Sequence, residues 1–101
     1  MEFQGNEKDF VNATKEGTVL VDFYAEWCGP CRMLAPVLEE LQAQKSDIKV
    51  VKVNVDANQT LAHDYGVIGV PYLILFKNGD PVAHTSGFRP IDALIEWIEA
   101  N

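Results

Sequence analysis

The residues best suited to chemistry are two cysteines, Cys28 and Cys31, with Gly29 and Pro30 between them. A spacing of three brings the thiols within one turn, close enough to form a disulfide bond. An apolar run ends just before Cys28 and a helical pattern begins near Cys31. The unpaired amides and dipole of that helix favour a thiolate at the first cysteine. Such a thiolate can attack a partner's disulfide, and the second thiol can then release the partner in reduced form.

Three other interpretations of the cysteine pair are open from the residues alone. Zinc usually takes four protein ligands, but there is no second cysteine pair and His63 and His84 lack zinc-ligand spacing, so no metal is expected. A purely structural disulfide would close too short a loop to add much stability. Two unreactive core cysteines fit poorly with the glycine and proline that separate them at a junction of elements.

Three further positions invite a functional interpretation. Asp22 interrupts an apolar strand, so it is either buried, with a raised pKa suited to proton exchange with a thiol, or a solvated acid at the strand end. Lys52 interrupts the next strand and either pairs with Asp22 or keeps its charge in water. The Val70–Pro71 bond is either cis, which would present the Val70 backbone to a ligand, or a trans bond at a strand start.

The elements that must position these residues follow from apolar periodicity and turn residues. Because two strand–helix–strand crossovers occur in sequence, the pattern predicts parallel neighbours among the first three strands. Asn78-Gly79 predicts a hairpin that adds an antiparallel strand, placed at an edge by Pro81. The predicted fold class is α/β, a mixed central sheet of four to five strands with helices on both faces, in one domain over residues 1–101. Helices are predicted over 6–16, 31–41, 60–65 and 90–98, and strands over 19–25, 48–55, 72–76 and 82–85, with a short extra strand within 2–5.

Composition narrows the class of partner. The 101 residues are 48% hydrophobic and carry 15 acidic against 8 basic side chains, a formal charge of -7. This acidic balance argues against binding to nucleic acid or to an anionic membrane. No apolar stretch is long enough to span a bilayer and no targeting segment is recognisable, so a cytoplasmic protein is expected.

The motif Trp-Cys-Gly-Pro-Cys, preceded by Val-Asp-Phe-Tyr-Ala-Glu, strongly resembles the thioredoxin family. Segments 52–56, 65–71 and 75–79 extend the resemblance from about residue 6 to the end of the chain. The resemblance implies a thioredoxin fold and a general protein-disulfide reductase that holds no cofactor of its own. It also implies a monomer that acts on disulfide-containing client proteins and is re-reduced by thioredoxin reductase, an NADPH-dependent flavoprotein.

The resemblance further implies a role for each candidate residue. Cys28 would attack, Cys31 would resolve, Asp22 would assist deprotonation of the second cysteine, and Lys52 would lie near that acid. Pro71 would follow a cis bond opposite the disulfide. The implied substrate-docking surface consists of Trp27, Gly29, Pro30, Val70, Pro71 and Gly87.

Three residues depart from the family pattern. Tyr24 stands where tryptophan is common, Tyr72 where threonine is usual, and Phe88 where a small residue is usual. Because Tyr72 and Phe88 fall at or near the implied docking surface, they put the range of clients in question. These two residues leave open a reductase dedicated to one client. A redox-independent binding subunit is the other alternative, and it is indicated by the apolar patch of Trp27, Val70, Pro71 and Phe88.

Overall fold

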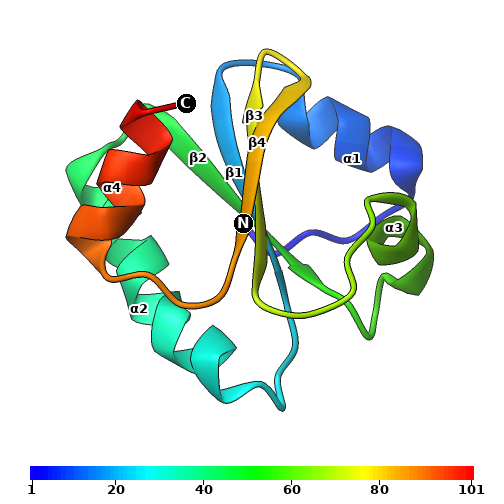
Figure 1. Cartoon of the computed structure of the whole chain (residues 1–101). Coiled ribbons are helices and arrows are strands. Elements are labelled where there is room, and N and C mark those ends of the chain that lie inside the picture. The colour runs from blue at the N-terminus through cyan, green and yellow to red at the C-terminus, as the bar shows by residue number, and fades with distance from the viewer.

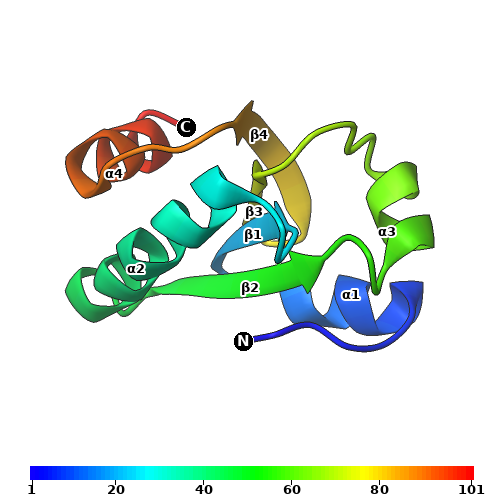
Figure 2. The same ribbon diagram turned by 90° about the horizontal axis from the view of Figure 1, so that it is seen from below.

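In the computed structural model, which describes residues 1–101, a four-stranded sheet separates two layers of helices (Figure 1). The strand order is β2-β1-β3-β4. Figures 1 and 2 place α1 and α3 on one face of the sheet and α2 and α4 on the other. The predicted α/β class with helices on both faces is therefore confirmed. The elements are α1 (Glu7–Thr14), β1 (Thr18–Tyr24), α2 (Gly29–Gln44), β2 (Ile48–Asn54), α3 (Gln59–Asp64), β3 (Tyr72–Lys77), β4 (Asp80–Ser86) and α4 (Ile91–Glu99).

The direction of β3 differs from the sequence prediction. β1 and β2 are parallel, as expected, but β3 runs antiparallel to β1. The reason is the length of the second crossover. The six residues of α3 rise only about 9 Å, whereas the seven residues of β2 span about 23 Å. Since α3 cannot carry the chain back along the strand, β3 enters the sheet at the end of the strands where β2 leaves it, and so runs in the opposite direction.

Local signals explain most of the element boundaries. Asn6 caps α1 through a reciprocal pair of hydrogen bonds with Asp9. α2 begins at Gly29, two residues earlier than predicted, because Cys28 itself is the N-cap. Asn78 and Gly79 both take positive φ, which fits the tight turn that joins β3 to β4. The strand predicted within residues 2–5 is reduced to one isolated bridge between Glu2 and Lys52.

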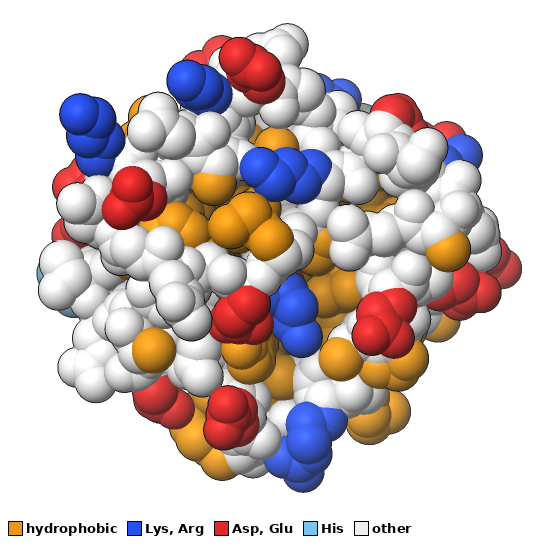
Figure 3. All heavy atoms as spheres, turned by 180° about the vertical axis from the view of Figure 1, so that it is seen from behind, with side chains coloured by type: hydrophobic (Ala, Val, Ile, Leu, Met, Phe, Trp, Pro, Cys, Tyr) orange, Lys and Arg blue, Asp and Glu red, His pale blue; other side chains and the backbone are white.

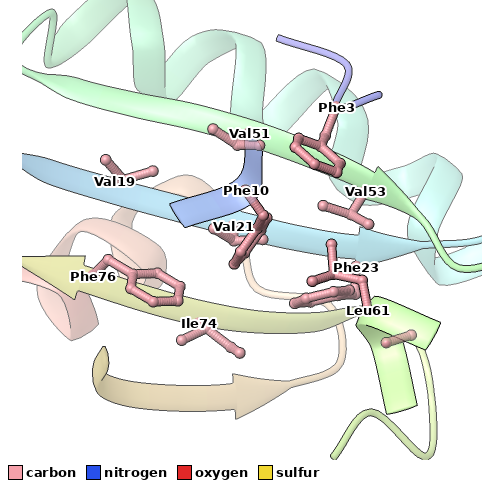
Figure 4. Packing of buried hydrophobic residues seen from close by; sticks show 11 residues of the cluster. Phe3, Phe10, Val19, Val21, Phe23, Val51, Val53, Leu61, Ile74 and Phe76 are labelled. Atoms are coloured by element: carbon pink, nitrogen blue, oxygen red, sulfur yellow. The ribbon is translucent and has the colours of Figure 1, made fainter. Parts of the chain in front are cut away.

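Each face of the sheet has its own hydrophobic core. Because side chains alternate along a strand, Val19, Val21 and Phe23 of β1 face α1 and α3, while Leu20 faces α2 and α4. Figure 4 shows the first core, in which the rings of Phe3, Phe10, Phe23 and Phe76 gather over β1–β3. β1 is buried on both faces, in agreement with its predicted central place, and β4 forms the predicted edge. No helix has the length and apolar character needed to cross a membrane.

Candidate active site at the N-terminus of α2

The two cysteines are bonded to each other at the junction of β1 and α2. Their Cα atoms lie 5.2 Å apart. Cys28 is the N-cap of α2, and its Sγ accepts the backbone N–H of Cys31 at 3.2 Å. A sulfur in this position faces the unpaired amides of the first helical turn, which stabilise negative charge. The geometry therefore suits a sulfur that becomes a thiolate when the disulfide is reduced.

The loop before β3 lies against the disulfide. The Val70–Pro71 peptide bond is cis, and the carbonyl oxygen of Val70 lies 3.7 Å from Cys28 Sγ. The backbone N–H of Gly87 donates to the carbonyl oxygen of Pro71 at 3.0 Å. Gly87 has φ +87°, a conformation that favours glycine. The structure thus brings Val70, Pro71 and Gly87 together beside the cysteines, although they lie far from them in the sequence.

Trp27 extends an apolar surface beside the disulfide. Its side chain is 69% exposed, yet its indole N–H donates to the Asp56 carboxylate at 3.0 Å. The bond ties the exposed ring to the end of β2. Ile68 and Phe88, on the loops that carry Val70 and Gly87, are also exposed. An acid just after an apolar strand was the only sequence signal for Asp56, and our prediction missed it.

Asp22 is buried, which settles a question that its sequence pattern left open. The residue is 1% exposed, and its Oδ1 has no hydrogen-bond partner. Burial raises the pKa of Asp22 from 3.8 to about 7, against the positive charge of Lys52, which lowers it; the charge of Glu2 raises it further. The carboxyl group is therefore poised to gain or lose a proton near neutral pH.

Lys52 is the cross-strand neighbour of Asp22 but forms no ion pair with it. Its ammonium lies 4.7 Å from the centroid of the Tyr24 ring, in a cation–π contact. Beside it is a cavity of about 180 Å³ that extends to the second cysteine. The cavity is lined by Tyr24, Ala25, Glu26, Cys31, Arg32, Ala35 and Lys52. Lys52 and Cys31 thus share one pocket between β1, β2 and α2.

Gly29 and Pro30 occupy the first turn of α2, between the cysteines. A Cβ at Gly29 would meet no atom within 4 Å, so the backbone here is open to an approaching chain. No group of three or more His, Cys, Asp or Glu side chains is gathered in a metal-binding arrangement.

The family model for thioredoxin matches residues 3–100. The chain belongs to the thioredoxin family. It is 47% identical over 99 residues to thioredoxin of Bacillus subtilis (strain 168), an alignment that covers 97% of this chain and 95% of that protein. It is also 47% identical to thioredoxin of Chlamydia caviae over 94 residues, or 93% of this chain and 92% of that protein.

Solved structures agree with this assignment. A mutant thioredoxin from Halobacterium salinarum NRC-1 superposes with a TM-score of 0.86 at 48% identity, covering 99% of this chain and 88% of that one. The chain is therefore a protein-disulfide oxidoreductase with a redox-active cysteine pair, and the predicted family, fold and activity are confirmed. Thioredoxins in general are reduced by thioredoxin reductase and act on disulfide-containing clients.

Proposed function

We propose that this thioredoxin reduces client proteins by attack of Cys28 and resolution by Cys31. The observation that carries the assignment is the hydrogen bond from the Cys31 amide to Cys28 Sγ at the N-terminus of α2. In the reduced protein, the Cys28 thiolate attacks one sulfur of a client disulfide. The client S–S bond breaks, a Cys28–client mixed disulfide forms, and the departing client sulfur takes up a proton.

The second step is the attack of Cys31 on Cys28 Sγ. Asp22, as a carboxylate, accepts the Cys31 thiol proton; its cross-strand neighbour Lys52 lines the same cavity as Cys31, which supports this role. The Cys28–Cys31 bond then forms, the mixed disulfide breaks, and the second client sulfur leaves as a thiolate, which takes up a proton from Asp22 or from water. The client has gained two electrons and the chain is oxidised. Lys52 sets the charge beside Asp22 and so adjusts the pH at which the acid can accept this proton.

The docking surface for clients consists of Trp27, Gly29, Pro30, Val70, Pro71 and Gly87. The contact of Val70 with Cys28 Sγ and the bond between Gly87 and Pro71 support this assignment. A client segment laid along the Val70 backbone would bring its disulfide to Cys28. The exposed rings of Trp27 and Phe88 offer apolar contact area on the flanks of that segment. The same surface could serve a redox-independent binding role, which loss of the cysteines would leave intact.

The cellular setting completes the proposal. An NADPH-dependent thioredoxin reductase re-reduces the Cys28–Cys31 disulfide, and the chain acts in the cytoplasm as a single domain over residues 1–101 and as a monomer. The family membership supports each of these statements.

Trapping of the mixed disulfide tests the order of attack. Cys31→Ser should accumulate a covalent complex with a disulfide-containing protein, because nothing resolves it, whereas Cys28→Ser should form none. Both variants should lose turnover. A covalent complex formed by Cys28→Ser and not by Cys31→Ser would reverse the assignment. A Cys28→Ser/Cys31→Ser protein that still captured the same clients without a covalent bond would favour the binding role.

A further inference from the structure

The segment before α1 brings a third charged residue into line with Asp22 and Lys52. The backbone N–H of Phe3 donates to the Lys52 carbonyl, and the N–H of Lys52 donates to the Met1 carbonyl, both at 2.8 Å. Glu2 is thereby paired in parallel with Lys52, which is itself paired with Asp22. Because opposed residues share a face of the sheet, Glu2, Lys52 and Asp22 form a row that runs from the surface to the buried acid.

Phe3 fixes this segment against the body of the protein. Its ring is 2% exposed and packs edge-on against Phe10, with centroids 5.5 Å apart. The terminal ammonium of Met1 also donates to the Val50 carbonyl at 2.7 Å. Because Met1 and Phe3 on either side of it are both fixed, Glu2 has a defined position. Figure 3 views the side on which β2 and the N-terminus lie, and there acidic and basic side chains stand side by side among apolar atoms.

Tyr24 links Glu2 to Lys52. The Tyr24 hydroxyl donates to Glu2 Oε2 at 2.7 Å, a charge-assisted bond, and the Lys52 ammonium rests over the Tyr24 ring. The bond fixes the ring, and the ring provides the surface on which the ammonium lies. The ammonium is consequently held at the wall of the cavity that Cys31 also lines, without an ion pair to Asp22.

We propose that Glu2 is a positioning residue for proton transfer at the disulfide, because it holds Tyr24 in place and Tyr24 keeps the Lys52 ammonium away from contact with Asp22. The proposal rests on the role given above to Asp22. Tyr24 stands where tryptophan is common in the family, and its hydroxyl is what makes the link to Glu2 possible. An ammonium in direct contact with Asp22 would hold the acid as a carboxylate to lower pH and weaken it as a proton acceptor.

The charged and titratable groups around Asp22 are few. Lys52 faces it from β2 and Glu2 from the N-terminal segment, while its β3 neighbour, Leu73, is apolar. Cys31 and Arg32 of α2 and Glu26 of the loop before α2 line the cavity beside Lys52. Among these groups, only Lys52 is both positively charged and directly opposite Asp22, so its position should dominate the response to substitution.

Two substitutions at Glu2 separate positioning from simple charge. Glu2→Gln and Glu2→Ala remove the same negative charge, but glutamine keeps an oxygen that can accept the Tyr24 hydroxyl. The measurement is the titration of the Asp22 carboxyl carbon by NMR in the oxidised full-length chain. We expect the pKa of Asp22 to be lower in Glu2→Ala than in Glu2→Gln by at least about half a unit, because the freed ammonium moves towards the acid.

Two further variants define the path. Glu2→Gln/Tyr24→Phe breaks the same bond from the other side and should titrate like Glu2→Ala. In a Lys52→Met background the alanine and glutamine variants should titrate alike, because no ammonium is left to move. The pH profile for resolution of the mixed disulfide should lie at lower pH in Glu2→Ala than in Glu2→Gln, by the same amount as the difference in the pKa of Asp22. Tyr65→Phe, which removes a hydroxyl on the opposite face of the sheet, is the matched control. It should change neither the pKa of Asp22 nor the pH profile for resolution.

Equal pKa values for Asp22 in Glu2→Ala and Glu2→Gln would overturn the proposal and leave Glu2 as a charge acting at a distance. A difference that persisted without Lys52 would overturn it as well. Because the titration needs no turnover, its outcome is separate from that of the trapping experiment, which tests the proposed function.

Discussion

Replacement of Asp22 by asparagine should make the protein more stable, and the gain should depend on pH. The carboxyl is 1% exposed, has an oxygen without a partner, and has its pKa raised from 3.8 to about 7. Asparagine has nearly the same shape and cannot ionise. Any cost of burying its amide is the same at every pH, so the pH-dependent part of the difference reports Asp22 alone.

The sign and size of the pH-dependent change in the free energy of unfolding follow from the two pKa values of Asp22. In the unfolded chain Asp22 loses its proton near pH 3.8, whereas in the folded protein it loses it near pH 7. Between these values the folded state binds more protons, so Asp22 makes the free energy of unfolding fall as pH rises, by up to about 1.4 kcal/mol per pH unit. Above pH 7 the loss levels off. A shift of about three units corresponds to roughly 4 kcal/mol.

Guanidinium denaturation of the oxidised protein, carried out from pH 3.5 to 9, measures this difference. The gain in Asp22→Asn over the natural chain should grow from pH 4 to 7 and then stay constant. Asp80→Asn, at an exposed position in β4, should show no such growth. Two results would refute the claim that Asp22 is a buried acid whose ionisation destabilises the fold. One is a stability difference that does not vary with pH, and the other is a natural chain that gains stability relative to Asp22→Asn above pH 7.

Four further substitutions test the core packing, the backbone conformation at two glycines and the docking surface. Phe10→Ala should lower the free energy of unfolding by about 3–5 kcal/mol, measured by denaturation, because the fully buried ring lies at the centre of the aromatic core. Gly87→Ala should cost about 1–2 kcal/mol through its φ of +87°, whereas Gly29→Ala, with no positive φ and open space around it, should cost less than about 0.5 kcal/mol. Trp27→Ala should leave stability within about 0.5 kcal/mol, because the ring is exposed, but raise the KM for protein clients; an unchanged KM would count against its place in the docking surface.

Much of the fold was accessible from the sequence because its signals are local. Alternating apolar residues, the Asn6 cap and the Asn78-Gly79 turn each act within a few residues, and every predicted element except the short strand within residues 2–5 is present. The direction of β3 was wrong because it depends on how far the short α3 can carry the chain, a property of the assembled sheet. The strand expected within residues 2–5 shrank to one bridge for a similar reason, since pairing there depends on β2.

In the site, too, local signals predicted some features, and tertiary structure decided the others. Spacing and position at a helix start were enough to select Cys28 and Cys31. The burial of Asp22 and the contact of Val70 with Cys28 depend on tertiary structure, so the residue pattern left both open and only the family resemblance favoured them. The bonds of Tyr24 to Glu2 and of Trp27 to Asp56 join residues 22 and 29 positions apart, and no local pattern predicts them.

The reduction potential of the Cys28–Cys31 pair tests the central claim most directly. The oxidised and reduced proteins would be equilibrated in defined dithiol–disulfide buffers, and the free thiols counted after alkylation. An electron donor to other proteins should give a value close to the known potential of thioredoxin, about -270 mV. A value near -180 mV or above, in the range of isomerases and oxidants, would contradict the assignment of this chain as a disulfide reductase.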